Sequence, residues 1–389
     1  MKRIFITGAA GFLGRNLIAH LRERPGLALR CFDRGDTPRQ LIEALVEADV
    51  VFHLAGVNRP ADPLEFETGN VALTAQICNV LHRAGRAPAI VFASSVQAAL
   101  DNPYGTSKAS AERALRQFAA ESGARVRIYR LKNLFGKWCR PHYNSVVATF
   151  CHNIARDLPI DISDPATEIE LTHVDDVVEA FLAELDGTAT DLEAGGGIRS
   201  RRITLAELAA QIHAFHAMRT TLLLPGLQCW FDRALYATYL SHVPAEAREH
   251  PLLAHQDARG SLAEFLKQDC FGQIFVSRTR PGVTRGNHYH HGKSEKFLVL
   301  EGSALIRLRD IRGEAIQEYR VTGERYQVID IPPGFAHSIA NVGAGDLVTL
   351  FWASEIFDQE RPDTYPFPVG LEPASPEQVV PEPIVVESV

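Results

Sequence analysis

The sequence lacks the features that mark several classes of protein. No apolar run approaches the roughly 20 residues that a membrane span requires, and no helix-turn-helix or basic segment suggests a nucleic-acid partner. Acidic residues outnumber basic ones by 47 to 40, for a formal charge of -7. The six cysteines include no Cys-x-x-Cys pair, which favours free thiols in a reducing compartment. Because Met1-Lys2-Arg3 leads directly into an apolar segment, we expect no signal peptide. We therefore expect a cytoplasmic protein with no membrane or nucleic-acid partner.

Two hydrophobic patterns divide the chain. In the first, short apolar strands alternate with helical stretches, as in a Rossmann-type doubly wound parallel sheet. In the second, short β-rich runs are separated by Gly and Pro, as in an all-β barrel. We expect an α/β domain at 1–245, a barrel domain at 246–370 and a Pro/Glu-rich tail at 371–389. The strands expected in the first domain are 3–8, 29–33, 50–56, 89–95 and 126–131.

The segment "TGAAGFLG" predicts a nucleotide site. It places Gly8, Gly11 and Gly14 between an expected strand and an expected helix. Glycines at this spacing let the backbone approach a pyrophosphate, and the helix N-terminus adds partial positive charge. At the end of the next strand, Asp33 favours an unphosphorylated ribose, whereas Arg34 suits a 2′-phosphate. The residues alone leave NADH and NADPH both open.

The stretch "ASSVQAALDNPYGTSK" supplies a candidate proton donor. Tyr104 and Lys108 are four residues apart at an expected helix start, so they share one face. We expect the Lys108 ammonium to lower the Tyr104 pKa and make the phenol a usable proton shuttle. Ser95, or its neighbour Ser94, can hold the reacting oxygen. A surface lysine at a helix start is the alternative, but the glycine motif and the serine-ending strand favour catalysis.

These motifs together resemble the extended short-chain dehydrogenase/reductase family, whose members act mostly on nucleotide sugars. The resemblance also includes "HLAG", "NLFG" and "THVDDVV". It implies that Asn133 and Arg59 bind the substrate. The lack of a carboxylate pair in "SSVQAAL" argues against dehydration, a reaction of some family members. The residues implied to bind the cofactor come from the glycine loop, the strand ends and the catalytic pair: Gly8, Gly11, Phe12, Leu13, Gly14, Asp33, Arg34, Leu54, Ala55, Gly56, Tyr104 and Lys108.

A second motif, "GNHYHHGKSEKF", concentrates metal-binding side chains. His288 and His290 are two residues apart and would project from the same face of a strand. Glu295 begins the next expected strand, and His337 follows in "PPGFAHSIAN". Three imidazoles and one carboxylate suit a borderline divalent ion such as Zn²⁺, with positions left for a ligand. A solvated histidine-rich loop is the alternative.

This spacing resembles the two motifs of the cupin superfamily, small β-barrels with a metal inside. The expected architecture is therefore a Rossmann-type α/β domain followed by a C-terminal all-β cupin barrel. His291 and Lys296 are the candidate acid and base of the barrel site, and each is also compatible with a supporting or surface role. The resemblance implies four metal ligands: His288, His290, Glu295 and His337.

Together the two regions suggest successive steps on one 4-keto sugar. A metal in the barrel can polarise the ketone and favour proton loss from the neighbouring carbon, which permits epimerisation. The first region can then reduce the same ketone with a hydride from the cofactor and a proton from Tyr104. The order of the motifs, from "HLAGVNRP" through "DARGSLAEF" to the histidine stretch, closely resembles the bifunctional reductase/epimerases of bacterial capsule and O-antigen synthesis.

That resemblance implies a specific chemistry. The barrel epimerises C3 of a UDP-2-acetamido-2,6-dideoxy-4-keto-hexose. The first domain then reduces C4 with NADPH to UDP-2-acetamido-2,6-dideoxy-L-talose, on the route to UDP-N-acetyl-L-fucosamine. A homodimer is also implied. Two alternatives stay open: an NAD(P)H-dependent UDP-sugar reductase with a structural cupin, and a non-enzymatic sugar-nucleotide sensor.

Overall fold

The computed structural model contains two compact units, Met1–Ile212 and His213–Val389. The residues it describes contain no helix with the length and apolar character of a membrane span. The expected tail at 371–389 and Cys270 lie outside the described residues. These are 1–60, 62, 64–189, 197–252, 254–257, 260–263, 272–355, 358 and 360–370.

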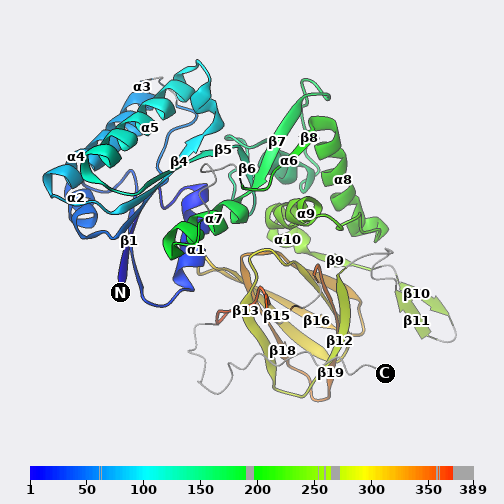
Figure 1. Cartoon of the computed structure of the whole chain (residues 1–389). Helices are drawn as coiled ribbons and strands as arrows, with labels where there is room; N and C mark the ends of the chain where they lie inside the picture. The colour runs from blue at the N-terminus through cyan, green and yellow to red at the C-terminus, as the bar shows by residue number, and fades with distance from the viewer. Residues whose placement is uncertain are drawn as a thin grey trace. The chain divides into compact units, whose positions relative to one another are not determined.

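The first unit is built on a five-stranded parallel sheet with strand order β2-β1-β3-β4-β5 (Figure 1). The central strand β3 is buried along its whole length, as expected where helices cover both faces of a sheet. All five strands expected from the sequence are present, so the doubly wound fold is confirmed. Their bounds are β1 (Lys2–Thr7), β2 (Leu27–Phe32), β3 (Val50–His53), β4 (Ala89–Ser95) and β5 (Val126–Leu131).

Helices cover both faces of this sheet. Apolar side chains of α1 and α7 pack on one face, and those of α2, α4 and α5 pack on the other. A π-helical turn, η1 (Glu67–Ala72), precedes α4, and a 3₁₀ turn, η2 (Val96–Ala99), follows β4. The described helices that lie wholly within this unit are α1 (Phe12–Arg22), α2 (Pro38–Glu47), α3 (Leu64–Phe66), α4 (Leu73–Arg83), α5 (Pro103–Ser122), α6 (Val146–Ile154) and α7 (Val174–Asp186).

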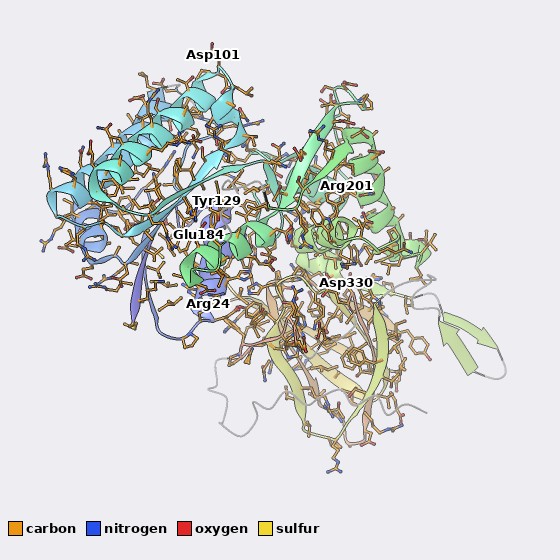
Figure 2. The ribbon with its side chains drawn as sticks, viewed as in Figure 1. Arg24, Asp101, Tyr129, Glu184, Arg201 and Asp330 are labelled. Atoms are coloured by element: carbon orange, nitrogen blue, oxygen red, sulfur yellow. The ribbon has the colours of Figure 1, made fainter. Side chains whose placement is uncertain are left out.

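A buried hydrogen bond ties α7 to the edge of the sheet. The hydroxyl of Tyr129 on β5 donates to the Glu184 carboxylate on α7 over 2.9 Å (Figure 2). Burial, followed by this carboxylate, raises the Tyr129 pKa, so the phenol stays protonated and keeps donating.

The first unit also contains a small three-stranded sheet, formed by β6 (Asn133–Phe135), β7 (Glu168–His173) and β8 (Arg201–Thr204).

The second unit is dominated by two five-stranded antiparallel sheets, ordered β12-β19-β14-β17-β9 and β16-β15-β18-β13-β20. Their inward side chains form one apolar core, so the all-β architecture expected after the α/β domain is confirmed, and it is consistent with a cupin barrel. A hairpin of β10 (Ala254–Asp257) and β11 (Gly260–Ala263) precedes it. The strands of the two sheets are β9 (Glu249–Pro251), β12 (Gln273–Thr279), β13 (Thr284–Tyr289), β14 (Glu295–Glu301), β15 (Ser303–Asp310), β16 (Ile316–Thr322), β17 (Gln327–Ile331), β18 (Phe335–Asn341), β19 (Leu347–Ala353) and β20 (Tyr365–Pro366).

A helical segment also belongs to the second unit. It consists of the end of α8 (Leu205–Thr221), α9 (Trp230–His242) and α10 (Ala245–Arg248). The division between the compact units therefore falls within α8, earlier than the expected domain boundary at 245. The physical reason is side-chain packing: Arg219 pairs with Asp330 of β17 at 2.6 Å, and the Tyr236 ring packs edge-on against Trp352 of β19.

Candidate active sites

The glycine loop in the first unit is shaped for close approach of a ligand to the backbone. Gly8 has a φ of 68°, a left-handed conformation that favours glycine, and a Cβ there would lie 2.7 Å from the Ala55 nitrogen. A Cβ on Gly14 would lie 2.2 Å from the Gly8 carbonyl oxygen. The loop leads directly into α1, whose N-terminus is a suitable anion site. These features fit a dinucleotide cofactor.

Asp33 and Arg34, the two candidate cofactor-selecting residues, have different partners. One carboxylate oxygen of Asp33 accepts a 2.9 Å hydrogen bond from the Ala10 backbone N–H. Burial raises the Asp33 pKa, and this hydrogen bond opposes the rise. The Arg34 side chain is 80% exposed and lies 3.7 Å from Glu65. Asp33 thus braces the glycine loop, whereas the Arg34 guanidinium remains accessible to a ligand.

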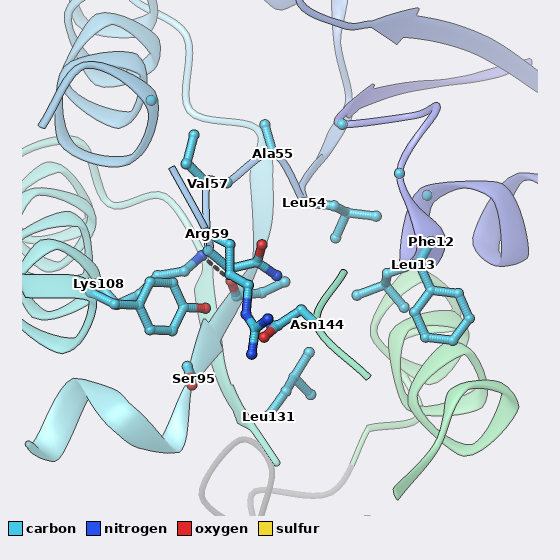
Figure 3. Close-up of a pocket in the computed structure, with 18 of the residues that line it drawn as sticks. Phe12, Leu13, Leu54, Ala55, Val57, Arg59, Ser95, Lys108, Leu131 and Asn144 are labelled. Carbon is cyan, nitrogen blue, oxygen red and sulfur yellow. Dashed lines mark hydrogen bonds between the residues drawn. The ribbon is translucent and has the colours of Figure 1, made fainter. Parts of the chain in front are cut away.

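The cavity beside this loop has a volume of about 1080 Å³, above the usual range for a single drug-sized ligand. Figure 3 shows Ser95 and Lys108 on one side and Phe12 and Leu13 on the other, with Arg59 between them. The structure brings all the expected cofactor- and substrate-binding residues of this unit to the cavity: Gly8, Gly11, Phe12, Leu13, Gly14, Asp33, Arg34, Leu54, Ala55, Gly56, Arg59, Ser95, Tyr104, Lys108 and Asn133.

The geometry distinguishes the two candidate serines. The Ser95 hydroxyl is near enough to the Tyr104 phenol to lower the Tyr104 pKa, and it accepts from the Gln97 backbone N–H at 3.2 Å. The Ser94 hydroxyl instead donates to the buried Glu112 carboxylate at 2.6 Å. Ser95 is therefore the serine placed beside Tyr104, and Ser94 supports the helix behind it.

The expected effect of Lys108 on the Tyr104 pKa is absent in this structure. Burial raises the Tyr104 pKa, against the lowering effect of the Ser95 hydrogen bond. The Lys108 ammonium donates to the Ala93 carbonyl at 2.9 Å and lies 4.9 Å from the centre of the Phe92 ring. Burial lowers the Lys108 pKa to about 8. The expectation was wrong because it considered helix spacing and not the desolvation of both groups.

A buried asparagine that the sequence analysis did not single out holds the catalytic segment in place. Asn70, on η1, accepts from the Val57 N–H at 2.7 Å and donates to the Val57 carbonyl at 3.0 Å. It also donates to the Ser107 hydroxyl at 2.9 Å, and that hydroxyl donates to the Tyr104 carbonyl. Asn70 thus joins the strand after β3 to the start of α5. Nothing in its local sequence pattern signals this long-range role.

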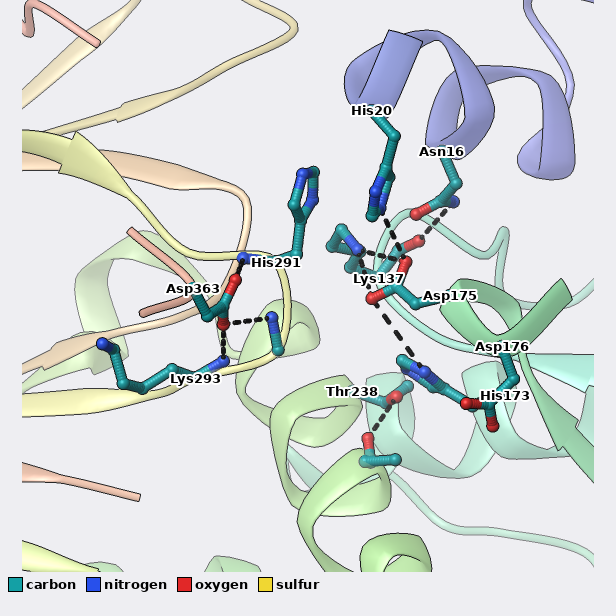
Figure 4. Close-up of polar contacts among 12 residues, drawn as sticks. Asn16, His20, Lys137, His173, Asp175, Asp176, Thr238, His291, Lys293 and Asp363 are labelled. Atoms are coloured by element: carbon teal, nitrogen blue, oxygen red, sulfur yellow. Dashed lines mark hydrogen bonds and ion pairs between the residues drawn. The ribbon is translucent and has the colours of Figure 1, made fainter. Parts of the chain in front are cut away.

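Two of the family-like motifs have a structural role here. Lys137, directly after "NLFG", pairs with Asp175 of "THVDDVV", with Nζ 2.7 and 2.8 Å from the two carboxylate oxygens (Figure 4). His20 of α1 lies 3.4 Å from the same carboxylate. Despite burial, the Lys137 charge holds the Asp175 pKa well below its usual range. This buried pair joins the segment after β6 to α7.

The four expected metal ligands come together in the second unit. His288 of β13 lies opposite His337 of β18 in the strand register, and Glu295 begins β14. Nε2 of His290 and Nε2 of His337 lie 3.3 and 3.2 Å from one oxygen of Glu295. One ligand atom from each of the four residues lies within 4.8 Å of the others. This convergence of three imidazoles and a carboxylate fits a divalent metal ion.

The protonation states of these side chains also suit a metal. Nδ1 of His290 lies 2.5 Å from the Asp363 carbonyl, and Nδ1 of His337 lies 3.2 Å from the Phe335 carbonyl. A carbonyl can only accept, so Nδ1 of each ring donates the bond, and Nε2 is the nitrogen that faces the centre. Burial, then the neighbouring imidazoles, lower the His288 pKa to about 3. Although burial opposes ionisation, the imidazoles hold the Glu295 pKa well below its usual range.

Of the two candidate acid–base residues, Lys296 is not brought to this centre. It follows Glu295 on β14 and points to the opposite face of the sheet, where its Nζ lies 2.5 Å from Asp330 in a buried ion pair. It is therefore removed from the candidates. His291 is buried, and its ring packs edge-on against Tyr289 and Tyr365 at centroid distances of 5.3 and 4.7 Å.

Comparisons with known proteins agree with this architecture. Residues 4–193 match the NAD dependent epimerase/dehydratase family, and residues 255–365 match the polysaccharide biosynthesis C-terminal domain. The crystal structure of the capsular polysaccharide assembling protein CapF from Staphylococcus aureus is 42% identical, with a TM-score of 0.65, and the match covers 94% of this chain and 100% of that one. A structure of CapF with the inhibitor 3-isopropenyl-tropolone is 39% identical, with a TM-score of 0.61, and covers the same shares.

The glycine loop, Tyr104 in the same cavity and the match of residues 4–193 fit a nicotinamide-dependent enzyme. A Pseudomonas aeruginosa protein named UDP-2-acetamido-2,6-beta-L-arabino-hexul-4-ose reductase is 44% identical over 368 residues, which cover 95% of this chain and 99% of that protein. The chain belongs to the family of this reductase. This membership supports a reductase-type activity in polysaccharide biosynthesis, with a nicotinamide cofactor.

Proposed function

We propose that the chain catalyses two successive steps on one UDP-activated 4-keto-6-deoxy amino sugar. The barrel epimerises C3 of a UDP-2-acetamido-2,6-dideoxy-4-keto-hexose, and the first unit reduces C4 with NADPH. The product is UDP-2-acetamido-2,6-dideoxy-L-talose, on the route to UDP-N-acetyl-L-fucosamine. One observation supports the proposal: each unit brings together its own set of candidate reactive side chains, Tyr104 with Ser95 in the first and the His/Glu tetrad in the second.

In the reduction step, the residues around Tyr104 handle the proton. When bound, NADPH supplies the hydride to C4. Tyr104 donates a proton to the oxygen that was the ketone, and the Ser95 hydroxyl holds that oxygen in reach. Lys108, whose pKa is about 8, is poised to support the resulting phenolate. Arg59 and Asn133, both in the wall of the same cavity, are the candidate contacts to the nucleotide sugar.

The choice of NADPH is supported by the surroundings of Arg34. Its guanidinium is largely exposed, and its Glu65 partner is 3.7 Å away, so it is accessible to a 2′-phosphate. One oxygen of Asp33 is already engaged by the glycine loop, which reduces its capacity to bind a ribose hydroxyl. The test is to measure the affinities of Arg34→Ala for NADPH and NADH. We expect weaker binding of NADPH and unchanged binding of NADH.

In the epimerisation step, the tetrad would hold a divalent ion such as Zn²⁺. When bound, the ion supplies the positive charge that acidifies the C3 proton beside the ketone. Hydrogen bonds from Nδ1 to backbone carbonyls would fix the ring orientations of His290 and His337. Glu295 would add the single negative charge of the ligand set. His291 stays the candidate for proton transfer at C3. A homodimer remains the expected assembly.

The proposal is tested by following C3 in D₂O by NMR, without NADPH, for the zinc-loaded and the chelator-treated protein. Deuterium should enter C3 only with the zinc-loaded sample, and added NADPH should then be oxidised as C4 is reduced. Absence of exchange, with NADPH still consumed, would leave a UDP-sugar reductase with a structural barrel. If the protein showed no exchange at C3 and no NADPH oxidation, the result would favour a sugar-nucleotide sensor.

A further inference from the structure

The segment 362–369, here called the C-terminal strap, lies across the loop that carries the metal-binding histidines. Within it, β20 pairs with the end of β13, with His288 opposite Pro366. The Phe367 N–H donates to the Asn287 carbonyl at 2.7 Å, and the Val369 N–H donates to the Asn287 side chain at 3.2 Å. A segment distant in sequence therefore contacts the end of the strand that carries His288.

Asp363 makes the densest set of contacts in this strap. Its carboxylate accepts from three consecutive backbone N–H groups, those of His291 at 2.9 Å, Gly292 at 3.0 Å and Lys293 at 2.8 Å (Figure 4). Its own carbonyl accepts from Nδ1 of His290 at 2.5 Å. Asp363 has a φ of 40°, a left-handed conformation that aspartate tolerates better than most residues.

These contacts act on both sides of the loop between two candidate metal ligands. The carbonyl fixes the tautomer and the ring orientation of His290. The carboxylate fixes the backbone of residues 291–293, which leads to Glu295. Bonds from backbone N–H groups to an ionised carboxylate are among the stronger hydrogen bonds in proteins. The Lys293 ammonium adds a bond to the Pro362 carbonyl at 3.1 Å, which holds the same strap from the other direction.

We propose that Asp363 is a positioning residue for the metal centre: it sets the separation and the orientation of His290 and Glu295 before the ion binds. The inference rests on the proposed function, because it requires that the tetrad of His288, His290, Glu295 and His337 binds a metal. A residue that only capped a surface turn would affect folding and would leave the affinity for the ion unchanged in the folded protein.

The test compares the full-length protein with Asp363→Asn and Asp363→Ala. Asparagine keeps the left-handed preference and one acceptor oxygen, but presents an amide donor to one of the three N–H groups. Zn²⁺ affinity is measured by competition with a chelating dye, and the d–d absorption of the Co²⁺-substituted protein reports ligand geometry. We expect roughly 10- to 100-fold weaker Zn²⁺ binding for Asp363→Ala, a smaller loss for Asp363→Asn, and an altered Co²⁺ spectrum in both.

The matched control is Asp358→Ala. Asp358 lies just before the strap and accepts a local 2.9 Å bond from the Glu360 N–H, and within the described part of the chain it has no hydrogen bond to the histidine loop. It should keep wild-type affinity and spectrum. Wild-type affinity and an unchanged Co²⁺ spectrum in folded Asp363→Asn would overturn the inference, even if Asp363→Ala failed to fold. A wild-type protein that binds neither ion would overturn the metal-dependent function itself.

Discussion

The two candidate centres differ in how closely their side chains are brought together. In the barrel, four side chains already converge within 4.8 Å, and backbone carbonyls fix two of the imidazoles. In the first unit, Lys108 donates to a backbone carbonyl, and burial raises the Tyr104 pKa. The difference teaches that antiparallel strands can bring together a complete set of candidate metal ligands, with backbone carbonyls orienting two of them. In the Rossmann site, close backbone approach at the glycine loop shapes the cavity, and the Lys108 ammonium is bound to a backbone carbonyl.

The largest effect is expected from removing a barrel ligand. His337→Ala deletes an imidazole from a four-residue set and should reduce C3 deuterium exchange by roughly 10³-fold or more, since metal assistance is worth several kcal/mol. Hydride transfer to a substrate that has been epimerised beforehand should continue. NMR of C3 and absorbance of NADPH measure the two steps separately. Loss of both steps in a folded variant would show that the centres are not independent.

A comparable effect on the other step is expected from Tyr104→Phe. Loss of the phenolic proton should slow reduction by roughly 10²- to 10⁴-fold, the usual contribution of a general acid. The ring remains, so its contact with Phe66 and the fold of α5 should persist. Stopped-flow NADPH oxidation measures the change. A reduction rate within twofold of the wild type would remove Tyr104 from the mechanism.

The preassembled barrel should depend on a buried ion network behind β14. Asp330 pairs with both Lys296 and Arg219, and its removal leaves buried cations unpaired. We expect Asp330→Asn to lower the free energy of unfolding by about 3–5 kcal/mol. The exposed pair Arg307–Glu318 provides the matched control, and Glu318→Gln should cost at most about 1 kcal/mol. Denaturant unfolding compares them, and equal small losses would contradict a structural role for the network.

The smallest effect concerns the cost of keeping Lys108 buried. Its folded pKa of about 8 lies below its ordinary value of 10.5, so the unfolded chain binds more protons between these two pH values. Stability of the cofactor-free protein should therefore rise with pH from about 8 to 10.5. Lys108→Met should abolish that rise and stabilise the protein at pH 7 while it slows reduction. Denaturant midpoints of the wild type and Lys108→Met are compared across this pH range. A wild-type stability that falls with rising pH, with no such fall in Lys108→Met, would contradict the assigned burial.

Much of the architecture followed from local pattern. Alternating apolar strands and helices predicted the parallel sheet, and Gly and Pro spacing predicted the barrel. The convergence of His288, His290, Glu295 and His337 followed from strand alternation and motif spacing, since each depends on near neighbours in sequence or on a second recognisable motif.

Contacts between distant segments explain what the sequence could not provide. Asp363 contacts the histidine loop although it is 72 residues from His291 in sequence, and Asn70 acts through a bond to Ser107 on another helix. Lys296 was misassigned although strand alternation from Glu295 already placed it on the other face. The Tyr104 pKa depends on desolvation by the whole surrounding unit, a quantity that four-residue spacing does not contain.

The central claim, that the chain holds two independent reactive centres, is tested most directly by one comparison. We would measure the rate of C3 deuterium exchange in D₂O, without NADPH, for zinc-loaded wild type, Tyr104→Phe and His337→Ala. The account predicts equal exchange in wild type and Tyr104→Phe and none above background in His337→Ala. Exchange that is lost in Tyr104→Phe and persists in His337→Ala would assign C3 chemistry to the first unit and contradict the account.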